Sequence, residues 1–133
     1  MVDSTPYAAL IGKRIHSFEL NPDRTELSIF IETPDFSLWE KYKFIVEGEC
    51  CSITWFESMD APEVLIGGIV SSVEDIDMPD LGSKGTINHP YVDHVVYYGL
   101  KVTTDKGVCV IDYRNDSNGY YGGSVTLTQG ELP

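Results

Sequence analysis

Apolar and polar residues alternate along several stretches of the chain, which is typical of β-strands with one buried face. Residues 14–20 and 27–31 alternate in this way on either side of a turn-forming segment at 21–24, so they predict a hairpin. Two runs rich in valine flank a second turn at 105–107 and give the strongest hairpin signal. The seven expected strands cover residues 14–20, 27–31, 38–46, 69–76, 94–104, 108–113 and 124–128.

Between the third and fourth of these strands the pattern changes and indicates short helices. Ser52 can cap a helix over the following aromatic residues. Asp60 and Glu63 have capping-box spacing around Pro62, and the glycines at 67–68 would end that helix. The prediction is an α+β fold: a mostly antiparallel curved sheet or small open barrel of about seven strands, with one or two short helices after the third strand.

The length of 133 residues predicts a single domain, with flexible ends at residues 1–9 and 129–133. The N-terminal residues do not resemble a signal peptide, and no apolar run is long enough to predict a membrane-spanning helix. The three cysteines show no disulfide pattern, which favours reduced thiols in the cytoplasm. The oligomeric state stays open.

The charge is strongly acidic, with 21 acidic and 9 basic residues and a net charge of −12. Such a surface repels phosphate backbones and anionic lipids, which argues against direct binding to nucleic acid or to a membrane. Residues 44–83 contain nine acidic residues and no lysine or arginine. This charge favours a partner protein with a basic surface. The alternative is that the charge only keeps the protein soluble.

Two dense blocks of unusual residues stand out, CCSITWFE at 50–57 and NDSNGYYGGS at 115–124. Five residues could supply ligands to a zinc site, but two adjacent cysteines cannot easily both coordinate one tetrahedral ion. Those ligands are Cys50, Cys51, Cys109, His89 and His94. A nucleophilic cysteine at the start of the expected helix is opposed by neighbouring glutamates.

Two further chemistries fit the residues only loosely. Residues 74–80 hold four acids, but the segment lacks the glycine and the spacing of an EF-hand loop, so whether the acidic segment 47–80 binds a cation stays open. The glycines at 119–123 match no phosphate-binding motif and suit turns instead. We therefore assign no catalytic residue, no metal site and no cofactor.

Aromatic side chains are numerous, and exposed tyrosine and tryptophan commonly anchor protein interfaces. The alternative is a packed aromatic core. The residues expected to bind a partner or a ligand are Trp55, Arg114, Asn115, Tyr120 and Tyr121.

The chain resembles a family of small uncharacterised domains encoded by bacteriophages and by some actinobacteria. The resemblance is carried by the two blocks and by IGK at 11–13, LIG at 65–67 and RN at 114–115, and it spans roughly residues 10–125. The resemblance implies a bacteriophage or actinobacterial origin but no particular activity.

From these observations we expect a protein of unknown function, most simply a non-enzymatic phage accessory protein that binds a host protein. The alternative is a binder of a small nucleotide-like ligand, held by Arg114, Asn115 and a stacking tyrosine. An enzyme that uses Cys50 or Cys51 and an acidic DNA mimic are weaker hypotheses.

Overall fold

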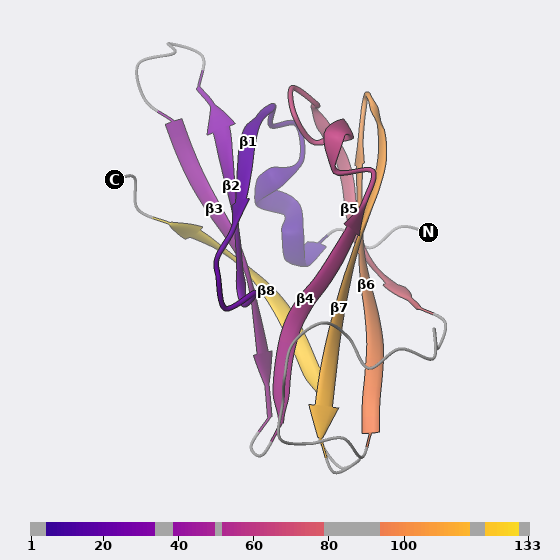
Figure 1. Cartoon of the computed structure of the whole chain (residues 1–133). Helices are drawn as coiled ribbons and strands as arrows, with labels where there is room; N and C mark the ends of the chain where they lie inside the picture. Colours follow the sequence, from indigo (N-terminus) through magenta and orange to yellow (C-terminus); the bar gives the residue numbers. More distant parts are fainter. Residues whose placement is uncertain (1–4, 34–38, 50–51, 79–93, 118–121, 131–133) are drawn as a thin grey trace.

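The alternating runs form two four-stranded antiparallel sheets that face one another (Figure 1). The computed structural model describes residues 5–33, 39–49, 52–78, 94–117 and 122–130. The strands are β1 (Ile15–Leu20), β2 (Glu26–Glu32), β3 (Trp39–Gly48), β4 (Ile53–Asp60), β5 (Val70–Asp77), β6 (His94–Thr104), β7 (Gly107–Ser117) and β8 (Gly123–Gly130). One sheet has the order β1-β2-β3-β8 and the other the order β4-β7-β6-β5.

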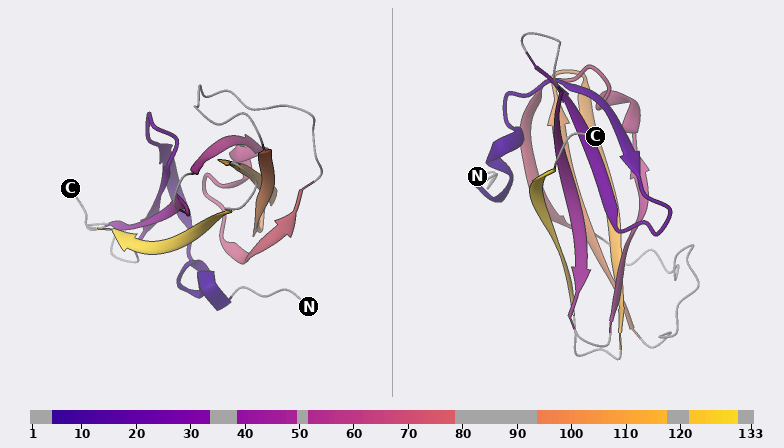
Figure 2. Two further views of the ribbon diagram at one scale, coloured as in Figure 1. Left: turned by 90° about the horizontal axis from the view of Figure 1, so that it is seen from below. Right: turned by 90° about the vertical axis from the view of Figure 1, so that its left-hand side faces the viewer.

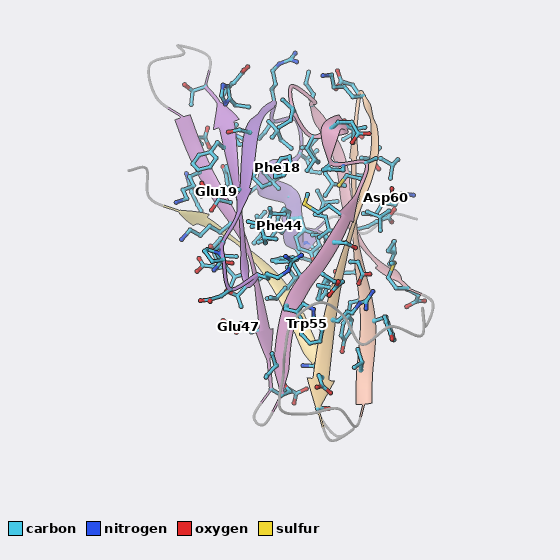
Figure 3. The ribbon with its side chains drawn as sticks, viewed as in Figure 1. Phe18, Glu19, Phe44, Glu47, Trp55 and Asp60 are labelled. Atoms are coloured by element: carbon cyan, nitrogen blue, oxygen red, sulfur yellow. The ribbon has the colours of Figure 1, made fainter. Side chains whose placement is uncertain are left out.

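The predicted hairpins are confirmed. β1 pairs antiparallel with β2, and β6 pairs antiparallel with β7 over its whole length. Alternate residues of each strand face the space between the sheets and form the hydrophobic core, where Phe44 lies between the two layers (Figure 3). Leu27, Ile29 and Ile31 supply this face of β2, and Ile111 and Tyr113 supply it on β7.

The expected α+β class, with a curved sheet or small open barrel of about seven strands, is wrong. The described residues form two sheets and no α-helix, because residues 53–60 are strand β4. Trp55 and Phe56 are both buried although they point to opposite faces of β4. Apolar residues on both faces remove the alternation, and a short continuous apolar run does not distinguish a strand from a helix.

The second expected helix is only a single 3-10 turn, η2 (Pro62–Val64). Asp60 ends β4 and caps nothing; Ala61 occupies the cap position with a left-handed backbone (φ 58°, ψ 49°) and no side-chain hydrogen bond. The segment is therefore a tight connection between β4 and β5.

The N-terminal end was expected to be flexible, but its described part belongs to the 3-10 segment η1 (Thr5–Leu10). This segment contacts the edge strands β5 and β8 on one side of the two sheets (Figure 2). Its Tyr7 and Leu10 are buried in the core. On the opposite side, Arg24 connects the β1–β2 turn to β4. Its Nε donates to the carbonyl of Phe56 (2.8 Å) and its Nη2 to that of Glu57 (2.5 Å), at the irregularity in β4 between Phe56 and Ser58.

Replacing Arg24 with methionine is expected to lower the free energy of unfolding by about 2 kcal/mol, because two carbonyls then lose a charged donor. Urea unfolding measures the change. Arg14→Met is the matched control, since Arg14 is more exposed and its guanidinium donates to the single carbonyl of Gly67. A loss no larger than the control's would show that Arg24 does not hold the two sheets together.

Candidate functional site

The described parts of the two dense blocks are adjacent, because β4 pairs with β7. Trp55 is opposite Arg114 and Thr54 is opposite Asn115 in this register. Three of the five expected binding residues are thus neighbours in the strand register, with Trp55 and Arg114 on one face of the sheet and Asn115 on the other. The other two, Tyr120 and Tyr121, lie outside the described residues, as do Cys50 and Cys51.

Trp55 and Arg114 belong to a buried polar layer on the face of the second sheet that points away from the core. We define this layer as Trp55, Glu57, Tyr97, Asp112 and Arg114. Arg114 is 4% exposed and donates to both carboxylate oxygens of Asp112, at 3.2 and 2.9 Å, and its guanidinium lies 4.8 Å from the centre of the Tyr97 ring. The hydrogen bonds with Asp112 raise the pKa of Arg114.

In the same layer, Trp55 Nε1 donates to Glu57 Oε1 at 2.9 Å, and Trp55 is completely buried. Trp55 and Arg114 are therefore not surface side chains, and in this conformation they stabilise the sheet. A direct role for them in binding stays a prediction.

Asn115 lies on the opposite, inner face, at the end where the two sheets come together. Its Nδ2 donates to Thr54 Oγ1 at 2.9 Å, and the residue is wholly buried. Gly48 and Gly123 pair across β3 and β8 above this contact. A Cβ on either glycine would lie 2.7 Å from Thr54 Oγ1, so the close approach of the sheets requires glycine at both positions.

A hollow of about 320 Å³ opens beside η1, between the edge strands β5 and β8. Asp77, Tyr98 and Tyr113 follow one another across β5, β6 and β7 in register, and all three line it. Asp75 lines it too, since alternate residues of a strand share a face. We call this space the inner hollow.

A second hollow of about 180 Å³ shares Gly123 and Ser124 with the inner hollow, and Glu47 and Glu49 line it. Gly122 lines this second hollow and lies close to Tyr98 of the inner hollow. A Cβ there would be 2.9 Å from Tyr98 Oη and 3.9 Å from Glu49 Oε1. We call the two hollows together the acidic cleft. No lysine or arginine is among its described lining residues.

Elsewhere on the surface, ion pairs offset part of the acidic charge. Lysines pair with glutamates in three places: Lys13 with Glu40, Lys43 with Glu26, and Lys101 with Glu74. The described carboxylates of the acidic cleft make no such ion pair. Of the surface that the structure describes, the acidic cleft is therefore a place where negative charge is not offset by ion pairs.

Tyrosine hydroxyls surround Asp75 at the inner hollow. Tyr7 Oη donates to Asp75 Oδ1 at 2.8 Å, and Tyr98 stacks on Tyr113 with ring centres 5.0 Å apart. Burial raises the pKa of both Tyr7 and Tyr113, and the negative charge of Asp75 raises each further. These hydroxyls are therefore protonated at neutral pH.

The zinc and cysteine hypotheses gain no support from the described residues. Cys109 lies in the core, and burial raises the pKa of its thiol to about 12, which suppresses the reactive thiolate. The part of the chain that the structure describes has no group of three histidine, cysteine or acidic side chains that could hold a metal ion.

The sequence showed that acidic residues are concentrated at 44–83, but it did not show the cleft. Glu47 and Asp77 are 30 positions apart in the sequence, and only the tertiary structure places their hollows on either side of Gly123 and Ser124. The useful signal was the absence of lysine and arginine between these acids.

Comparison with known proteins identifies one match. The family model of a domain of unknown function, DUF7448, matches residues 8–127. No curated protein and no solved structure matches the chain. Among the described residues, no helix has the length and apolar character needed to cross a membrane.

Proposed function

Because the chain belongs to this family of domains of unknown function, we propose its role from its geometry: it is a non-enzymatic binding protein whose acidic cleft contacts a partner protein with a basic surface. The observation that carries this proposal is that two hollows sharing Gly123 and Ser124 are lined by four carboxylates, two from β5 and two from the end of β3 and the residue after it. These carboxylates belong to Glu47, Glu49, Asp75 and Asp77.

Electrostatics supports this role in two ways. A net charge of −12 accelerates the encounter with a positively charged partner, and a concave surface of one sign focuses the field. The tyrosines beside the carboxylates are side chains that protein interfaces favour.

The resemblance to bacteriophage and actinobacterial domains extends the proposal. In this view the protein is a phage accessory factor, and its partner is a protein of the host cytoplasm. The odd number of cysteines without a disulfide pattern suits that compartment.

The test uses the double variant Asp75→Asn/Asp77→Asn, which removes two charges from the cleft. A partner captured from host lysate is identified, purified and titrated against the wild type at two salt concentrations. We expect the double variant to bind at least about tenfold more weakly, and wild-type binding to weaken steeply with salt.

The matched control is Glu19→Gln/Asp23→Asn, which removes the same charge from exposed positions on the β1–β2 hairpin. Equal binding by the two double variants would refute the acidic cleft as the contact surface. A failure to capture any specific partner would refute the proposal itself.

The alternative, a small nucleotide-like ligand held by Arg114 and Asn115, has weaker support. Arg114 is already bonded to Asp112, and both expected ligand-binding side chains are buried. An acidic DNA mimic predicts a DNA-binding partner, which the same capture experiment would identify.

A further inference from the structure

We infer that the inner hollow of the acidic cleft binds a primary ammonium group, presented by a lysine side chain of the partner protein or by a free polyamine. The inference rests on the proposed function, since it names the chemical group that the same cleft takes. It is argued from the hydrogen-bonding capacity, the spacing and the charge of Asp75, Asp77 and Tyr113.

Tyr113 is the first observation, because its hydroxyl is unused. The residue is 4% exposed and lines the inner hollow, and its ring packs against Tyr98 and Phe56. Its hydroxyl makes no hydrogen bond with the part of the chain that the structure describes. Among the described residues, the hydroxyl is not one of the fully buried polar atoms without a partner, so it is open to the hollow, where a ligand that donates a hydrogen bond can reach it.

Asp75 and Asp77 are the second observation. They lie two positions apart on β5 and line the same hollow, so their carboxylates are separated by roughly one strand repeat of 6–7 Å. Tyr7 holds Asp75 through Oδ1 and leaves Oδ2 available. The carboxylate of Asp77 is exposed at the mouth, opposite Tyr98 in the strand register.

The arrangement favours an ammonium group over a guanidinium. An ammonium directs three N–H donors in different directions, which suits acceptors that come from β5 on one side and β7 on the other. A guanidinium prefers both oxygens of one carboxylate, so it is disfavoured at Asp75, where one oxygen already accepts from Tyr7 and the other is left as a single acceptor. The described acids form no group of three that could hold a metal ion, whereas an ammonium needs only one or two.

The experiment titrates purified protein calorimetrically with spermidine, with Nα-acetyl-lysine methylamide, with its arginine counterpart and with calcium chloride. We expect the lysine compound to bind more tightly than the arginine compound, and calcium not to compete. Tyr113→Phe keeps the ring but removes the acceptor, so it should weaken amine binding about tenfold. Asp77→Asn, at an exposed position, should do the same without any effect on folding.

Tyr42→Phe is the matched control, because the Tyr42 hydroxyl donates to Glu40 away from the cleft. Unchanged amine binding in Tyr113→Phe, equal binding of the arginine compound, or displacement of spermidine by calcium would overturn the inference. Tighter binding of spermidine than of a lysine-containing peptide would identify a free polyamine as the source, and the reverse order would identify a protein.

The two proposals fail in different ways. Capture of a basic partner that depends on Asp75 and Asp77 but not on Tyr113 would remove the ammonium site and leave the proposed function intact. Amine binding that depends on Tyr113, without any captured partner, would support the ammonium site and refute the proposed function.

Discussion

Arg114→Met is expected to lower the free energy of unfolding by about 3–5 kcal/mol, because it leaves the carboxylate of Asp112 buried without its positive partner. The guanidinium also offsets the negative charge of Glu57 and stacks on Tyr97, so several contacts of the buried polar layer end at once. Urea unfolding at neutral pH measures the loss.

The double variant Asp112→Leu/Arg114→Met separates the buried charge from the lost packing. Replacement of a whole buried ion pair by apolar residues is often close to neutral, so the double variant should recover most of the loss. A single variant that stays within about 1 kcal/mol of the wild type would mean that solvent reaches Asp112 and that the layer is not a stabilising unit.

Trp55→Ala is expected to cost about 3–5 kcal/mol, since it removes the largest fully buried side chain among the described residues and leaves a cavity on the outer face of β4. It also removes the indole N–H that donates to Glu57. Trp55→Phe keeps much of the volume but not this donor, and should cost less. Thermal and urea unfolding of the two variants separate the packing contribution from the hydrogen bond.

These two variants also test where the expected binding residues act. If Trp55 and Arg114 contribute only to stability, conservative variants that remain folded will bind the partner of the acidic cleft with unchanged affinity. Equal unfolding energies for Trp55→Ala and the wild type would contradict the burial of this residue.

Most strand positions were predictable, because they depend on local patterning. β2 alternates buried Leu27, Ile29 and Ile31 with half-buried residues, and the turn at Asp105 and Lys106 connects β6 to β7. β4 was not predictable by this route. Trp55 and Phe56 are buried on opposite faces of β4, so its apolar residues do not alternate with polar ones. The segment is a strand because it pairs with β7, whose partner residues lie at least 50 positions away in the sequence.

The candidate site, like the fold, was predictable from the sequence only in part. The amino-acid sequence alone established a strong negative charge, a segment without basic residues, and two blocks of unusual composition. It could not establish that Trp55 and Arg114 are buried in one layer, or that Asp75 and Asp77 line one hollow with Tyr98 and Tyr113. Strand alternation depends on neighbouring residues. The cleft lies beside the edge strands of two sheets that pack face to face, and that packing depends on residues distant in the chain.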